Sequence, residues 1–124
     1  MLIILFAALD SFAVGVLPDP GECLMEGIAS WYSESSPGIN ETTANMERFD
    51  HDKLTCAAWN IPFNTMLEVT NLSNGKSVLV RVNDRGPAER YCTEGRVIDL
   101  TIGAFARIED PQKGLAPVEV RIAE

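Results

Sequence analysis

The chain has 124 residues, 46% of them hydrophobic, and its 18 acidic and 10 basic residues give a net charge of −8. This length and composition suit one domain that builds its own core without a structural metal. The negative balance leaves no basic stripe to release the counterions of a polyanion, which excludes nucleic acid as a partner.

The first 26 residues are expected to lie outside the domain. Residues 1–9 read MLIILFAAL, an apolar run that is too short to span a bilayer and typical of the core of a secretory signal peptide. Residues 11–13 offer a cleavage site. Residues 14–26 mix prolines and acids without periodicity and are predicted to be a tether. We therefore expect an exported protein, in the periplasm, cell envelope or extracellular space, with no membrane span in its mature form and its domain at residues 27–124.

Strand patterns dominate the rest of the chain. In residues 77–83, Val78, Val80 and Val82 alternate with Leu79 and Arg81, the period of a strand with one buried face. Asn74 and Gly75 precede it and predict a hairpin with residues 66–71. Further strands are expected at residues 27–32, 96–101 and 117–122.

One helix is predicted, from Thr101 as its N-cap to about Ile108, and Asp110-Pro111 ends it. Many short strands with a single helix favour an all-β fold, a small closed barrel.

Three acids stand out in this framework. Asp84 lies in Asn-Asp-Arg-Gly-Pro at the end of a strand, where alone it is a common turn residue. Glu47 lies in a polar stretch, and Asp99 interrupts the apolar strand at residues 96–101, where it must be hydrogen-bonded or functional. The structural interpretation of Asp99 is a carboxylate that ties the strand to the helix start at Thr101, and Asp99→Asn should then lower stability.

The remaining chemical signals are weaker. Trp31 and Tyr32 suit either stacking on a sugar ring or filling the core. His51, the only histidine, lies between two aspartates and is interpreted as a solvated loop residue, so that no multi-histidine metal site exists and no nucleophile paired with a histidine is supported.

Three cysteines occur without the spacing of a zinc or redox motif. In an oxidising compartment Cys56 and Cys92 are the expected disulfide pair, because both lie inside the domain, whereas Cys23 precedes it. The alternative is three separate small apolar residues.

Five segments together carry a resemblance, in this order: GIASWYSESSPG, TANMERFD, LTCAAWNIPFNT, VTNLSNGKSVLVRVNDRGP and GRVIDLT. From Gly27 to about Ile122 the chain resembles the rare lipoprotein A family, the septal-ring lytic transglycosylases. The resemblance implies a six-stranded double-psi β-barrel with one or two short helices. It also implies an exported protein that acts on the glycan strands of bacterial peptidoglycan without a metal or organic cofactor, and we expect a monomer.

Carried over residue by residue, the resemblance implies that Glu47 and Asp84 are catalytic, and we expect them to face each other across one groove. Which of them is the acid/base and which gives electrostatic support stays open. The substrate-binding residues expected beside them are Trp31, Tyr32, Asn83, Arg85 and Asp99.

The chain departs from the family pattern at a few positions. Ala58 stands where the family has a histidine, and Met46, Asn64 and Ser33 stand where it prefers glycine. Ala58 favours an alternative function, a glycan-binding, wall-loosening module that does not cleave. A secreted inhibitor or adaptor barrel is a third interpretation, which explains neither catalytic acid.

Overall fold

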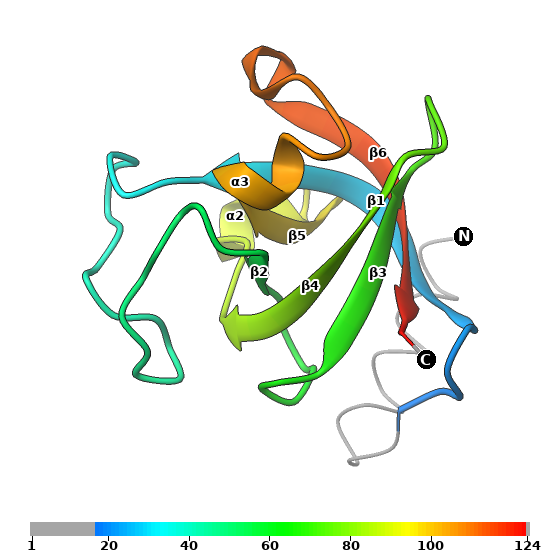
Figure 1. Ribbon diagram of the computed structural model, residues 1–124, viewed down its shortest axis with the longest axis horizontal. Coiled ribbons are helices and arrows are strands. Elements are labelled where there is room, and N and C mark those ends of the chain that lie inside the picture. The colour runs from blue at the N-terminus through cyan, green and yellow to red at the C-terminus, as the bar shows by residue number, and fades with distance from the viewer. Residues whose placement is uncertain (1–16, 124) are drawn as a thin grey trace.

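The computed structural model describes residues 17–123, which form a closed barrel of six strands (Figure 1). The expected signal segment therefore lies outside the described residues. The elements in chain order are β1 (Cys23–Tyr32), β2 (Thr55–Ala57), β3 (Met66–Asn71), β4 (Ser77–Asp84), α2 (Glu89–Cys92), β5 (Arg96–Thr101), α3 (Ile102–Phe105), the 3-10 helix η1 (Pro111–Lys113) and β6 (Leu115–Ile122).

The strands follow one another around the barrel in the order β1, β5, β2, β4, β3, β6. β1 pairs in parallel with β5 and β2 with β4, whereas the other pairs are antiparallel, including β1 with β6, which closes the barrel. The predicted all-β, six-stranded barrel with two short helices is confirmed. In Figure 1 the long connection between β1 and β2 loops out on the side of the barrel away from β3 and β6.

Most predicted strands occur where they were expected. β3 and β5 have the predicted bounds, and the hairpin between β3 and β4 turns through Gly75 at φ 77°. β1 begins at Cys23, four residues before the expected strand, so the expected domain start at Gly27 falls within it.

The helix after β5 is shorter than predicted. α3 ends at Phe105 instead of about Ile108. Thr101 is its N-cap, as predicted, because the threonine side chain accepts a hydrogen bond from the backbone N–H of Ala104.

The barrel interior is filled by alternate residues of the strands. Val80 and Val82 on β4, and Val118 and Val120 on β6, are fully buried. Each such side chain contributes about 1.5–3 kcal/mol on burial, so this core holds the strand ends that carry the polar site. Within the described chain no helix is long and apolar enough to cross a lipid bilayer.

The expected disulfide between Cys56 and Cys92 is wrong, because Cys23, Cys56 and Cys92 are all free thiols. Cys56 on β2 is fully buried in the core, where burial raises the pKa of its thiol. Cys92 is exposed at the end of α2, and its thiol donates to the carbonyl of Pro87.

Candidate active site

Strand register brings the two aspartates of the sequence analysis into one row. Ala57 on β2 is paired with Asp84 on β4 and with Asp99 on β5, and Asp99 is paired in turn with Ser30 on β1. Two inter-strand spacings separate the aspartates, so their Cα atoms lie about 10 Å apart. Ala57, whose side chain is a single methyl group, stands between the two aspartates in this row.

This row lies in a surface groove of about 540 Å³. The groove is lined by residues of β1, β2, the end of β4, α2 and β5, and by the start of the long loop that follows β1. Its aromatic and charged lining residues are Trp31, Tyr32, Trp59, Asp84, Arg85, Arg90, Tyr91, Arg96 and Asp99. Aromatic rings beside carboxyl groups suit a sugar, whose apolar face stacks on a ring while its polar groups are hydrogen-bonded.

The carboxyl group of Asp84 is held by the backbone. Its Oδ1 accepts hydrogen bonds of 2.9 Å from the N–H groups of Ala44 and Arg85. Its Oδ2 lies 3.5 Å from the hydroxyl of Tyr32, which donates to it. One oxygen is therefore fixed by the protein, and the other lies beside the tyrosine that shares the groove lining.

Asp99 occupies a different environment. Its Oδ1 accepts a hydrogen bond from the hydroxyl of Ser30. Burial raises the pKa of Asp99, and the negative charge of Asp84 adds to this, whereas Ser30 and Arg96 act in the opposite direction. The structural interpretation of Asp99 as a tie to the α3 start is wrong, because its bond runs to β1 while Thr101 caps the helix itself.

Gly86 allows the turn after Asp84 to approach Asp99. A Cβ atom at this position would lie 3.2 Å from Cβ of Ala57 and 3.3 Å from Oδ2 of Asp99. A side chain here would therefore crowd the space between the two aspartates.

Glu47 belongs to a separate network on the long loop between β1 and β2. The guanidinium of Arg81 donates to both carboxylate oxygens of Glu47, at 2.7 and 2.9 Å, and the side-chain amides of Asn45 and Asn83 donate at 2.9 and 3.1 Å. These bonds, that from Arg81 first, lower the pKa of Glu47 to about 2.

Glu47 and Asp84 are therefore not arranged as expected. Asp84 lines the groove, whereas Glu47 does not, and its carboxylate is bound to Arg81 and Asn83. The two networks remain neighbours, because Asn83 precedes Asp84 on β4 and the backbone N–H of Ala44 binds Asp84. The catalytic role of either acid stays a prediction.

Two expected substrate-binding residues also act within the protein. Asn83 is buried, donates to Glu47, and keeps its Oδ1 without a hydrogen-bond partner. Arg85 lines the groove, but its guanidinium donates to the carbonyls of Ala58 and Ile61 and lies 3.9 Å above the ring of Phe63. Arg85 therefore anchors the segment after β2.

Three further expected substrate-binding residues, Asp99 described above and Trp31 and Tyr32, line the groove, and the two aromatic residues also support it. The indole N–H of Trp31 donates to the carbonyl of Pro111 at 2.8 Å. Tyr32 stacks on Phe49 with ring centres 4.9 Å apart and planes within 8° of parallel. Burial raises the pKa of Tyr32, so its hydroxyl keeps the proton that it donates toward Asp84. The stack fastens the long loop to the end of β1.

Arg81, which belongs to the Glu47 network, gave no signal of its own in the sequence. Arg81 looks like an outward-facing residue of a strand, and only its period-two spacing from Asn83 indicates that both face the same side. Asn64 accepts a hydrogen bond from Arg81 at 2.9 Å. Met46, which precedes Glu47, and Asn64 both have left-handed backbone conformations, with φ 74° and 71°. Both stand where the family prefers glycine, the residue suited to that conformation.

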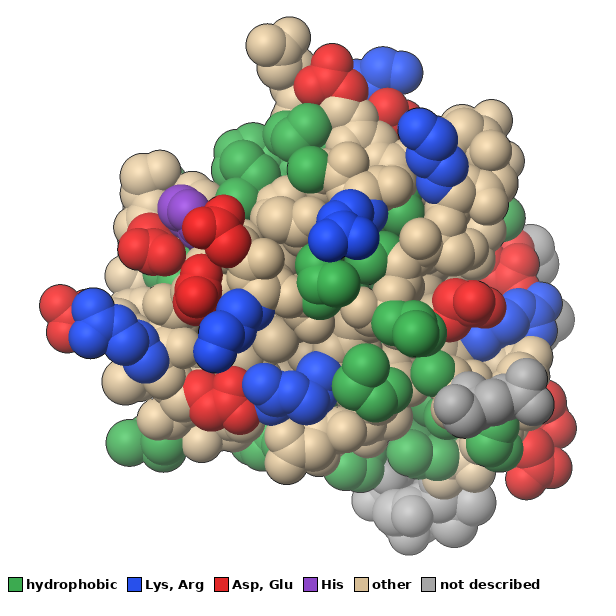
Figure 2. Space-filling model, in the orientation of Figure 1, with side chains coloured by type: hydrophobic (Ala, Val, Ile, Leu, Met, Phe, Trp, Pro, Cys, Tyr) green, Lys and Arg blue, Asp and Glu red, His purple; other side chains and the backbone are tan. Residues whose placement is uncertain are grey.

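Ala58, which replaces the family histidine, is fully buried in the core and does not line the groove. His51 accepts a hydrogen bond from the N–H of Glu34 and lies 3.8 Å from the carboxylates of Glu34 and Asp52. Figure 2 shows the histidine among acidic side chains. In residues 17–123 no group of three or more His, Cys, Asp and Glu residues could hold a metal ion.

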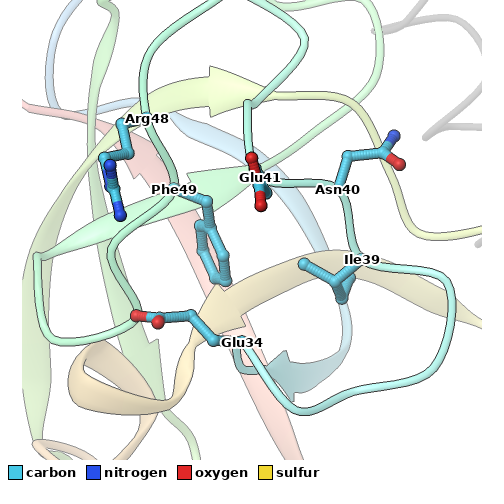
Figure 3. Close-up of a pocket in the computed structure, with 6 residues that line it drawn as sticks. All are labelled: Glu34, Ile39, Asn40, Glu41, Arg48 and Phe49. Carbon is cyan, nitrogen blue, oxygen red and sulfur yellow. The ribbon is translucent and has the colours of Figure 1, made fainter.

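A second hollow of about 220 Å³ lies beside the groove, since Ile39 lines both. Figure 3 shows Phe49 in the middle of this hollow, with Glu34, Arg48 and Ile39 around it and the side chain of Asn40 turned away. Phe49 lines this hollow, and Tyr32, which stacks on it, lines the groove.

Residues 24–120 match the family described as lytic transglycolase. The chain belongs to this family. Similar curated proteins include a probable endolytic peptidoglycan transglycosylase RlpA from Synechocystis sp., 48% identical over 79% of this chain and 29% of that protein. The endolytic peptidoglycan transglycosylase RlpA of Campylobacter jejuni is 44% identical over 78% of this chain and 33% of that protein. The chain thus spans a third or less of the length of these relatives.

Solved structures share the fold. The Streptomyces papain inhibitor superimposes with a TM-score of 0.64 at 21% identity, covering 85% of this chain and 97% of the inhibitor. A Clavibacter michiganensis expansin in complex with cellohexaose gives a TM-score of 0.58 at 23% identity, covering 80% of this chain and 50% of the expansin. At these identities the likeness concerns the barrel alone.

Proposed function

We propose that this domain is an endolytic lytic transglycosylase of the cell envelope. It cleaves the bond between N-acetylmuramic acid and N-acetylglucosamine in peptidoglycan strands and leaves 1,6-anhydro ends. The observation that carries the proposal is the pair of carboxyl groups of Asp84 and Asp99 in one aromatic-lined groove, in a member of the lytic transglycolase family. The names of its relatives support peptidoglycan as the substrate. Because peptidoglycan is a polymer of the cell wall, we infer that the protein is exported.

Within this proposal we give the acid/base role to Asp84. A lytic transglycosylase needs a group that protonates the leaving oxygen and then accepts a proton from the 6-hydroxyl of the same sugar. The bond from C1 to the leaving oxygen breaks, the bond from C1 to O6 forms, and no water is consumed. Asp84 suits this exchange, because backbone N–H groups fix one of its oxygens and the other lies beside Tyr32 in the groove lining.

Asp99 supports this role by keeping a proton in the groove. Because burial raises its pKa, Asp99 keeps its proton up to a higher pH than an isolated aspartate would. Glu47 cannot supply this proton near neutral pH, since its pKa is about 2. We assign Glu47 the positioning of β4 through Arg81 and Asn83.

The test is a digest of purified glycan strands analysed by mass spectrometry. Cleavage by this mechanism gives fragments that end in 1,6-anhydro-muramic acid, and these fragments should be lost in Asp84→Asn. Reducing ends that have gained a water molecule would identify a hydrolase and overturn the proposal.

A non-cleaving glycan-binding module remains the second candidate function. It is favoured by Ala58, which offers no side chain to the groove where the family has histidine. The same digest separates the two candidates, because the module would retain intact strands and release no anhydro ends.

A further inference from the structure

One wall of the groove carries two positive charges on a single aromatic ring. The guanidinium carbons of Arg96 and Arg90 lie 4.1 and 4.6 Å from the centre of the Tyr91 ring, and Arg90 also donates to the tyrosine hydroxyl at 3.2 Å. All three residues line the groove, Arg90 and Tyr91 from α2 and Arg96 from the first position of β5. The ring therefore orients both guanidinium groups at the edge of the site.

Neither guanidinium has an acidic partner in the described part of the chain, where the arginines that form salt bridges are Arg81 and Arg121. Arg85, the third arginine of the groove, differs because its guanidinium binds two backbone carbonyls. Arg96 does act on the charge of Asp99, yet the pKa of Asp99 stays raised. In a chain of net charge −8, this wall therefore presents two guanidinium groups that form no salt bridge with the described residues.

We propose that Arg90 and Arg96 form a subsite for a carboxylate carried by the glycan strand. The planar guanidinium fork matches a carboxylate, and partial desolvation in the groove strengthens the pairing. Muramic acid offers this group on its lactyl substituent or on a peptide attached there, whereas N-acetylglucosamine offers none. A carboxylate held on this wall would set which sugar lies over Asp84. The inference rests on the proposed function, because it names the feature of the strand that the same groove recognises.

The test compares peptide-free muramic-acid tetrasaccharides in three forms. One carries free lactyl carboxylates, the second has them converted to neutral methylamides, and the third carries L-alanine, which moves the carboxylate outward. Affinity is measured by titration calorimetry on Asp84→Asn protein, so that the strands are not consumed. We expect the free carboxylate or L-alanyl form to bind about tenfold tighter than the methylamide. Whichever charged form binds more tightly shows whether the subsite recognises the lactyl carboxylate itself or a carboxylate on an attached peptide.

The variant Arg90→Gln/Arg96→Gln should lose this tenfold preference and leave the affinity for the methylamide within about twofold. The control Lys76→Gln/Arg107→Gln removes the same charge outside the groove lining and should keep the preference. Arg90→Lys/Arg96→Lys retains the positive charge but not the planar guanidinium group, and it should keep part of the preference for the charged strands. A partial preference would show that this wall of the groove is still folded.

Equal affinity of the parent protein for charged and neutral strands would overturn the subsite, as would a preference that survives in Arg90→Gln/Arg96→Gln. The outcome is independent of cleavage. If the protein prefers charged strands but produces no anhydro ends, the subsite is supported and the proposed function is contradicted. If it produces anhydro ends without preferring charged strands, the proposed function is supported and the subsite is contradicted.

Discussion

The carboxyl groups of Glu47 and Asp99 lie in two contrasting environments. Glu47 is bound by a guanidinium and two amides, and its pKa is lowered to about 2. Asp99 has one hydroxyl donor, and burial raises its pKa. The first environment fixes a negative charge, and the second favours a proton.

Glu47 and Asp84, both carried over from the family pattern as catalytic acids, are therefore expected to have different roles. Asp84 shares the groove with Asp99, whereas Glu47 lies in the network that holds Arg81 and Asn83, earlier on the same strand. We therefore expect substitutions in the groove to act on the chemical step, and substitutions around Glu47 to act on the geometry and stability of β4.

The largest effect is expected for Asp84→Asn. Loss of the acid/base group should lower the rate of anhydro-end formation by about 10³-fold, while the melting temperature changes little. The rate is followed by mass spectrometry of glycan digests, with the exposed Asp19→Asn as the matched control. A rate within tenfold of the parent would remove Asp84 from the acid/base role.

A smaller effect is expected for Glu47→Gln. Glutamine keeps the size of the side chain but weakens the hydrogen bonds to Arg81. The cleavage rate should fall by about tenfold, because β4 is then positioned less accurately. Because the pair is partly exposed, its loss should cost only about 1 kcal/mol of unfolding free energy at pH 7.

The pH dependence of this stability difference follows from the lowered pKa of Glu47. Ionised Glu47 contributes fully to the unfolding free energy at a pH above its pKa in the unfolded chain, about 4.3, and this contribution disappears as the pH falls toward 2. Denaturant unfolding of Glu47→Gln and the parent between pH 2 and 7 checks this, with the exposed Glu94→Gln as control. A difference that persists unchanged at pH 2 would contradict the ion pair.

Met46→Gly tests the loop that presents Glu47. Methionine at φ 74° is strained, and glycine adopts this conformation freely. Glycine also gives the unfolded chain more conformational entropy, which offsets part of this relief of strain. We expect the unfolding free energy to rise by about 0.5 kcal/mol, seen as a higher melting temperature. Asn60→Gly, at φ 60°, is the comparison and should gain less, since asparagine tolerates the left-handed region.

The smallest effect is expected for Asp99→Asn, and its sign reverses the expectation from the sequence. Because the folded pKa of Asp99 is raised, ionisation destabilises the fold as the pH rises above the unfolded value of about 3.9. Asparagine still accepts from Ser30 and carries no charge. The variant should therefore be more stable by a few tenths of a kcal/mol at pH 7 and equal to the parent below about pH 4. Lower stability at pH 7 would show that the hydrogen bond outweighs desolvation.

The barrel was largely predictable because its strands carry strong local signals. Alternating valines and an Asn-Gly turn define β3 and β4, and β5 was found with its observed bounds. β2 was missed, since Thr55–Ala57 is three residues long and buried throughout, so no alternation exists to detect. The short α2 likewise has no buried residue that would give a helical period.

The hydrogen-bond partners of the candidate site residues could not be predicted from the sequence. The family pattern indicated Glu47 and Asp84, but Arg81 comes from a different element and contacts Glu47 only through the fold. The pairing of Ala57 with both Asp84 and Asp99 depends on strand register across β4, β2 and β5, which no local pattern encodes. Cys56 and Cys92 show the same limit, because their positions along the chain did not indicate that one points into the core.

A carboxyl ¹³C NMR titration of the native domain, with Glu47, Asp84 and Asp99 assigned from single variants, tests the contrast between the two environments most directly. We predict that Glu47 titrates with a lowered pKa of about 2, while Asp99 takes up its proton at a higher pH than an ordinary aspartate. A raised pKa at Glu47 together with an ordinary pKa at Asp99 would contradict it and return the acid/base role to Glu47.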